Sequence, residues 1–183
     1  MAKALPATKV ITGKVRFSYA HVFKPASIIE GGDLKYSVAI LIDKKDKETL
    51  AKINKALEAA KQAGAAMWGG KVPAILKMPL RDGDEERGDQ EEYKGCYFLN
   101  AASNQKPGVV NSNLDPILDP SEFYSGCYGK ASLNFYAFNQ AGNRGIAVGL
   151  NNLMKTADGV SLSGLSDPRS DFADEVEDDD DLF

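Results

Sequence analysis

The chain has 183 residues, of which 43% are hydrophobic and 9% aromatic, and this composition excludes a wholly disordered protein. Its length is typical of one globular domain. No apolar run approaches the roughly 18–20 residues of a membrane-spanning helix, and the first twenty residues contain no apolar block of the kind found in a secretory signal. Because two cysteines cannot build a disulfide framework, we expect a reduced, cytoplasmic location.

The net charge of −4 is distributed unevenly along the chain. Residues 166–183 contain nine acidic residues and one arginine, and residues 81–94 contain seven acidic and three basic residues. The rest of the chain has 18 basic and 10 acidic residues, a net charge of +8. Since blocks of like charge usually stay disordered, we expect one folded, basic domain over residues 1–165 and a disordered acidic tail over residues 166–183.

Four segments between residues 8 and 101 have the composition of β-strands. Residues 8–19 alternate polar and apolar side chains, with a bulge or bend expected at Gly13. Residues 34–42 are rich in Tyr, Val, Ile and Leu and predict a second strand. Shorter strands are expected over residues 74–80 and 97–101.

A single long helix is predicted between the second strand and the shorter ones. Residues 46–63 repeat apolar side chains along one helical stripe. Asp46 is the expected N-cap and Gly64 the expected C-terminal stop. No other segment has a comparable helical period.

The C-terminal half of the folded domain ends in a predicted β-hairpin. Residues 128–138 and 145–150 are the two strands, and residues 139–144 form a glycine-containing loop. Two loops are expected before the hairpin, namely the acidic residues 81–94 and the proline-rich residues 103–127.

Five or so strands with one inserted helix favour a small barrel over a parallel α/β fold, in which helices and strands would alternate. We therefore expect a mainly β protein, an OB-fold-like five-stranded barrel with one inserted α-helix and long loops. In the common OB-fold the helix follows the third strand, whereas here it follows the second predicted strand.

Residues that carry catalysis or bind zinc are scarce in this chain. His21 is the only histidine, and its place at the end of an aromatic strand favours a structural role. Cys96 and Cys127 lie 31 residues apart, without the partner spacing of a zinc site. The class expected is therefore a binding protein and not an enzyme.

The acidic loop contains a partial calcium-loop pattern. Asp82, Asp84 and Glu86 occupy the first, third and fifth ligand positions. The glycine, however, falls at the seventh position as Gly88, and the twelfth residue is Tyr93 instead of glutamate. We therefore expect no bound metal, and no cofactor.

Basic and aromatic residues lie next to one another along the predicted strands. This combination is typical of proteins that bind single-stranded nucleic acid. Cationic side chains contact the phosphates, and exposed aromatic rings stack on the bases, with a gain in binding free energy of roughly 1–3 kcal/mol per stacked base. We expect a basic, aromatic groove that binds single-stranded DNA with little sequence preference. The residues expected to line it are Lys14, Arg16, Tyr19, Lys35, Tyr36, Trp68, Lys71, Lys77, Lys106, Tyr128, Lys130, Tyr136 and Arg144.

The acidic tail ends in four aspartates followed by a leucine and a phenylalanine. A tethered polyanion beside a cationic groove can compete with DNA at high effective concentration, and a terminal apolar pair fits a hydrophobic pocket on a partner protein. The residues expected to act in this way are Asp178, Asp179, Asp180, Asp181, Leu182 and Phe183. The simpler interpretation is a tail that only keeps the protein soluble.

Five stretches of the chain have a sequence that is typical of one protein family, namely Gly13–Tyr19, Trp68–Lys71, Pro79–Asp84, Lys106–Val110 and Phe123–Gly129. In these stretches the chain resembles the single-stranded DNA-binding proteins of tailed bacteriophages, one branch of which was formerly a family of unknown function. The resemblance implies an OB-fold that coats single-stranded DNA in phage replication and recombination, in the host cytoplasm. It also implies a tail that contacts phage or host replication proteins such as a polymerase or helicase.

Two other functions stay open at this point. A phage virion or assembly protein with a solubilising tail would have the same composition, and an RNA-binding OB-fold protein would differ only in its response to the 2′-hydroxyl. A homo-oligomer is also open, because an exposed edge strand of the barrel could pair with a second copy.

Overall fold

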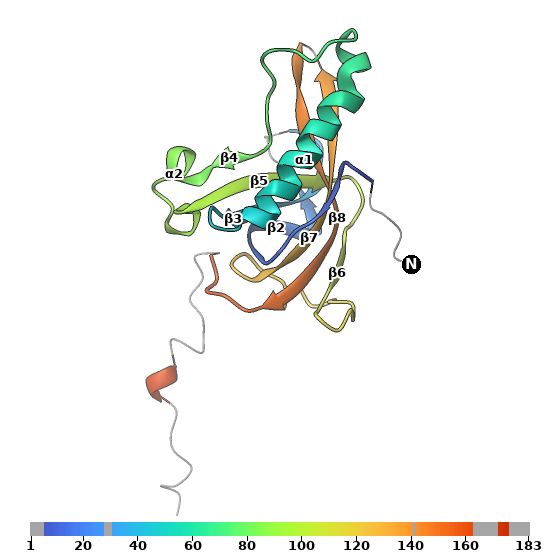
Figure 1. Ribbon diagram of the computed structural model, residues 1–183. Helices are drawn as coiled ribbons and strands as arrows, with labels where there is room; N and C mark the ends of the chain where they lie inside the picture. Colours follow the sequence, from blue (N-terminus) through green and yellow to red (C-terminus); the bar gives the residue numbers. More distant parts are fainter. Residues whose placement is uncertain (1–5, 28–30, 141, 163–171, 176–183) are drawn as a thin grey trace, which may run out of the picture.

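The computed structural model describes residues 6–27, 31–140, 142–162 and 172–175. Within these ranges the chain forms one eight-stranded sheet and one long helix (Figure 1). Five strands close into a ring, because β7 is hydrogen-bonded to β2 on one side and to β8 on the other. The predicted OB-fold-like barrel is therefore confirmed. In ring order its strands are β2 (Val15–Ala26), β3 (Lys35–Asp43), β5 (Cys96–Ser103), β8 (Asn143–Ala157) and β7 (Tyr128–Gln140).

Three short strands are added to this ring. β1 (Lys9–Ile11) pairs with β7, β6 (Gly108–Val110) pairs with β8, and β4 (Arg81–Asp82) pairs with β5. β1 and β6 end the sheet, and each has only three residues. Edges this short offer few free backbone groups to a second copy of the chain.

The barrel interior and the helix α1 (Lys47–Gly64) share one hydrophobic core. In Figure 1 the helix runs across the barrel, and its apolar stripe enters the core, as the sequence predicts. No described helix is long and apolar enough to cross a membrane. Core side chains that are less than 2% exposed include Phe17, Ile40, Ile53, Leu99, Leu133 and Phe135.

The predicted start of α1 at Asp46 and its end at Gly64 are confirmed, although Gly64 does not act as a left-handed cap. The carboxylate of Asp46 accepts a hydrogen bond of 3.1 Å from the Thr49 amide, as an N-cap does. Gly64 keeps a helical backbone, and the chain continues as a 3-10 helix, Ala65–Trp68, to a left-handed turn at Gly69 (φ +83°). A side chain at Gly64 would collide with Ala137, so close packing explains this glycine.

Two strand predictions need correction. The segment 8–19 breaks at Gly13 into β1 and β2, and β2 continues to Ala26. Residues 74–80 form no strand, only an isolated bridge between Lys77 and Gly145. Pro73 and Pro79 flank most of that segment and have no amide hydrogen to donate to a neighbouring strand. Regular pairing with β5 begins only at β4.

The remaining strand predictions are confirmed, with a tighter hairpin than expected. β3 and β5 match the predicted segments 34–42 and 97–101 within two residues at each end. β7 extends to Gln140 and β8 begins at Asn143, so most of the expected loop 139–144 belongs to the strands. Gly142 has a φ of +84°, as a two-residue hairpin turn requires.

Trp68 lies in the core and not in a groove. Its side chain is only 7% exposed, and its indole nitrogen donates a hydrogen bond of 3.1 Å to the Phe138 carbonyl. A ring held in this way has no free face for a base. The predicted DNA contact of Trp68 is therefore wrong, and the residue closes the end of α1 against the hairpin.

Because Trp68 is the only tryptophan, its emission reports directly on this packing. We expect a short-wavelength emission maximum and weak iodide quenching in the native protein, with a shift to longer wavelength on unfolding. Addition of oligo(dT) is expected to change the spectrum little, since no base reaches the ring. Strong iodide quenching of the folded protein would contradict this placement.

Candidate nucleic-acid interface

The outer surface of the barrel carries a strip of small and polar residues. Along β3 the inward side chains of Val38 and Ile40 join the core, so Ser37 and Ala39 face outward. Strand pairing places Ser18 beside Ala39, and Ala39 beside Asn100. A second row runs from His21 to Ser37, Ala102 and Gly149. We call these outward-facing residues the outer band. Ser18, Ser37 and Ala39 are covered, with at most 9% of each exposed, whereas the surface that stays open is formed by His21, Asn100, Ala102 and Gly149.

Two exposed tyrosines adjoin the outer band. Tyr19 is 53% exposed and lies at an irregularity of β2, with a φ of +46° that non-glycine residues rarely adopt. Its hydroxyl donates a hydrogen bond of 3.2 Å to the side chain of Gln90. Tyr136 is 46% exposed on β7, and a methyl group at Gly149 would lie 3.7 Å from its ring. Both rings therefore present a free face next to small side chains.

Three further predicted residues lie near the outer band. Lys35 pairs with Ala26 at the beginning of β3, and Tyr36 pairs with Ser103. The ammonium group of Lys106 lies 5.7 Å from the centre of the Phe23 ring on β2. These positions give the band a positive margin at the end where β3 begins.

A second group of predicted residues surrounds Tyr128. Its ring centre is 5.1 Å from the Lys14 ammonium and 5.4 Å from the Arg16 guanidinium. Arg16 also donates hydrogen bonds to the carbonyls of Gly126 (3.1 Å) and Val160 (2.9 Å). The guanidinium therefore holds the chain beyond β8 against the barrel, and only Lys14 stays exposed for a phosphate.

A third group lies by the β7–β8 hairpin. Lys77 donates a hydrogen bond of 3.0 Å to Asn143, and together with Arg144 these residues line a hollow beside Ile75, which is 89% exposed. Lys71 is exposed on the segment that leads to the hollow. Lys130 is exposed on β7 opposite Met154. The predicted residues thus form several groups around the barrel and no single groove.

The acidic residues 81–94, expected as a loop, are folded onto the barrel. They contain β4, the short helix α2 (Gly83–Glu86) and a 3-10 turn, Glu91–Tyr93. Tyr93 is 1% exposed and packs with Leu41 and Phe98 in a second, smaller cluster, its ring 5.1 Å from that of Phe98 and nearly perpendicular to it. Since Leu41 follows Ala39 of the band on β3, this segment, which we call the acidic wall, borders the outer band.

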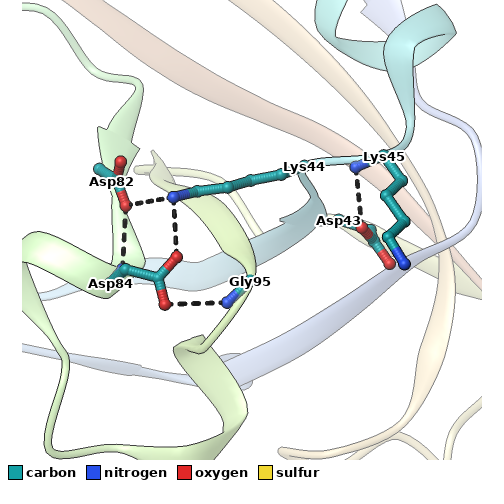
Figure 2. A network of polar contacts seen from close by, with 6 residues as sticks. All are labelled: Asp43, Lys44, Lys45, Asp82, Asp84 and Gly95. Atoms are coloured by element: carbon teal, nitrogen blue, oxygen red, sulfur yellow. Dashed lines mark hydrogen bonds and ion pairs between the residues drawn. The ribbon is translucent and has the colours of Figure 1, made fainter.

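Ion pairs fix the acidic wall to β3 (Figure 2). The Lys44 ammonium lies 2.8 Å from an oxygen of Asp82 and 2.7 Å from one of Asp84, whose other oxygen accepts a hydrogen bond of 3.1 Å from the Gly95 amide. These contacts raise the pKa of Lys44 and lower the pKa values of both carboxyls. All three groups are therefore charged at neutral pH.

A similar pair lies on the outside of the wall. The Arg81 guanidinium donates to both oxygens of Glu86, which lowers the pKa of that carboxyl. The three carboxylates of the partial calcium pattern thus have internal cations as partners. In the described part of the chain no three His, Cys, Asp or Glu side chains gather in a way that would hold a metal ion.

Most of the outer band was not predicted from the sequence. Ser37, Ala39, Asn100, Ala102 and Gly149 carry neither charge nor ring, and only the strand pairing brings them together. His21, expected to be structural, is exposed on the band beside Ser37. The predicted tail residues 178–183 lie outside the described ranges.

Comparison with known proteins supports this architecture. A solved single-stranded DNA-binding protein from bacteriophage Enc34, in complex with ssDNA, matches with a TM-score of 0.75 and 22% identity over 88% of this chain and 97% of that one. The single-stranded DNA-binding protein gp2.5 of bacteriophage T7 matches with a TM-score of 0.57 and 20% identity over 93% of this chain and 96% of that one. These likenesses show the fold.

Sequence comparison gives the family. Protein p50 of Acyrthosiphon pisum secondary endosymbiont phage 1 is 28% identical over 166 residues, which are 85% of this chain and 87% of that protein. The family model for the ssDNA-binding protein of Enterobacter phage Enc34 matches residues 8–183, nearly the whole chain. The chain therefore belongs to the family of the Enterobacter phage Enc34 single-stranded DNA-binding protein.

Proposed function

We propose that this chain is a phage protein that binds single-stranded DNA along the outer band. The observation that carries the proposal is the row of small residues between exposed tyrosine rings, on a barrel of this family. Small side chains let bases approach the sheet closely, and the rings of Tyr19 and Tyr136 offer stacking surfaces. Binding of this kind needs no catalytic group, in keeping with a binding protein and not an enzyme.

Little sequence preference follows from the same chemistry. Every base has a π-face on which a tyrosine can stack, whereas readout of one base requires several directed hydrogen bonds. The band offers few such groups, mainly Asn100 and His21, which are exposed. Lys35 and Lys106 would contact phosphates, so log K is expected to fall with log[salt] by about 0.7 per phosphate contacted.

The position where the described chain leaves the barrel supports a role for the tail. The Leu162 amide donates to the Ser125 carbonyl, and the Ser125 hydroxyl accepts from the Ala20 amide, next to Tyr19. The described range that ends at Leu162 therefore reaches a point beside Ala20 and Tyr19. We propose that residues 166–183 compete with DNA for the cationic margin.

The same tail would serve a second purpose in replication or recombination. Once DNA displaces it, Asp178–Asp181 together with Leu182 and Phe183 would bind a replication protein, the acidic run by charge and the apolar pair in a pocket. Such a protein would act in the host cytoplasm, where phage DNA is copied.

Stacking is tested by removing the two rings. Tyr19→Ala and Tyr136→Ala are each expected to weaken oligo(dT) binding by about 1–3 kcal/mol, measured by fluorescence anisotropy with labelled DNA. Tyr19→Phe and Tyr136→Phe keep the rings and should bind nearly as well as the unmodified protein. Full affinity of both alanine variants would exclude these residues as stacking surfaces.

The same titration separates the remaining alternatives. Matched oligonucleotides of RNA show whether the 2′-hydroxyl is tolerated, so preferential RNA binding would favour the RNA-binding alternative. A chain that binds neither polymer at low salt would instead fit a virion or assembly protein.

Close approach to the sheet is tested at Ala102, which faces outward at the centre of the band. Ala102→Leu is expected to weaken oligo(dT) binding by about tenfold, on the order of one stacked base, because the larger side chain displaces a base from the surface. Ala51→Leu on the exposed side of α1 is the matched control and should change neither affinity nor stability. Unchanged affinity of Ala102→Leu would place the DNA elsewhere.

Competition by the tail is tested by deleting residues 166–183. The shortened protein is expected to bind oligo(dT) more tightly at low salt. Its salt dependence should also be steeper, because in the full chain salt weakens the competitor together with the DNA contacts. Equal affinity of the two proteins across the salt range would refute competition and leave DNA binding intact.

A further inference from the structure

The acidic wall is a rigid part of the barrel surface. Gly83 lies so close to the Tyr93 and Cys96 carbonyls that a side chain there would collide with both. Arg81 and Arg87 lie 5.3 and 5.7 Å from the centre of the Phe98 ring beneath them. Together with the Lys44 ion pairs in Figure 2, these contacts hold the wall in one position.

The wall still carries negative charge after its ion pairs are counted. Asp82 and Asp84 share Lys44, Glu86 pairs with Arg81, and Glu91 pairs with Lys94. Among the described residues, no ion pair is formed by the other three carboxylates of the wall, which are Glu85, Asp89 and Glu92.

These three carboxylates belong to a segment that contacts the edge of the outer band. Asp89 is exposed and precedes Gln90, whose side chain accepts the hydrogen bond of Tyr19. Glu92 precedes Tyr93, whose hydroxyl is hydrogen-bonded to Ser18 of the band and whose pKa is raised by burial. Tyr19 and Ser18 are therefore both hydrogen-bonded to residues of the wall.

We infer that the acidic wall makes the protein selective for single-stranded over duplex DNA, by repelling the second strand. This inference rests on the proposed binding of single-stranded DNA along the outer band. A single strand lies on the small residues with its bases toward the sheet and its phosphates toward the lysines. A duplex is wider, and its second backbone would pass beside the wall.

Electrostatics gives the size of the effect. Duplex DNA carries one negative charge per 1.7 Å of its axis, and charges are screened only beyond about 8 Å at physiological salt. Three carboxylates beside a second backbone are expected to disfavour the duplex by about five- to tenfold in affinity at low salt. A single strand avoids most of this repulsion, since its flexible backbone can stay at the lysine margin.

The test neutralises the three carboxylates in the full-length chain. The triple variant Glu85→Gln, Asp89→Asn, Glu92→Gln is compared with the unmodified protein on oligo(dT) and on a blunt duplex of equal length. We expect duplex affinity to rise about five- to tenfold at low salt and oligo(dT) affinity to change less than about twofold. The gain should vanish at high salt.

The matched control adds the same charge elsewhere. Glu48→Gln, Glu58→Gln, Glu122→Gln replaces two exposed carboxylates of α1 and one of the loop before β7, and it should leave the ratio of duplex to single-strand affinity unchanged. Trp68 emission confirms that both variants are folded.

Two results would overturn the inference. If the control raises duplex affinity as much as the wall variant, the effect is general charge and not the wall. If the ratio stays constant in the wall variant while oligo(dT) still binds, the wall does not select. Failure of the unmodified protein to bind oligo(dT) is a different result, since it removes the proposed function itself.

Discussion

Burial of β3 on both faces is the constraint on which the surface of this barrel depends. Its inward residues Val38, Ile40 and Ile42 belong to the main core, as in any barrel strand. Its outward residue Leu41 is also buried, under Tyr93 and against Phe98. Toward the start of β3 the next outward residues, Ala39 and Ser37, are 1% and 9% exposed, so this face is also covered there.

This arrangement explains why the acidic wall and the outer band adjoin. A wall that carries seven acidic residues needs an apolar anchor and internal cations to stay folded on a barrel, because like charges otherwise extend a chain. Leu41 and Phe98 provide the anchor, and Lys44 and Arg81 provide the cations. All four lie on β3, β4 and β5 or directly after them, so the wall can form only at the end of these strands.

Local patterns in the sequence predicted the elements that depend on local physics. The helical period of residues 46–63 and the cap at Asp46 need only neighbours in the chain, and so does the hairpin around Gly142. The wall could not be predicted in this way, because Leu41 and Tyr93 are 52 residues apart and a run of carboxylates ordinarily indicates an exposed loop. Trp68 was misplaced for a related reason, since its hydrogen bond goes to Phe138 in a strand that forms much later in the chain.

The residues of the candidate site show the same limit of prediction from local sequence. Tyr19, Tyr136, Lys35 and Lys106 were predicted because rings and cations are visible in a sequence, whereas Ala102 and Gly149 have a role only through the strand that lies beside them. Arg16 shows the opposite error. It was predicted to contact DNA because it is a cation, but its guanidinium donates hydrogen bonds to backbone carbonyls of the chain itself. A charged residue in the sequence indicates that its side chain needs a hydrogen-bonding or ionic partner. Only the fold shows whether that partner is another group of the same chain or an external ligand. Arg16, Lys44 and Arg81 have internal partners of this kind. Lys35 and Lys106 form no ion pair among the described residues, and their place beside the outer band is the reason we propose them as contacts of an external anion.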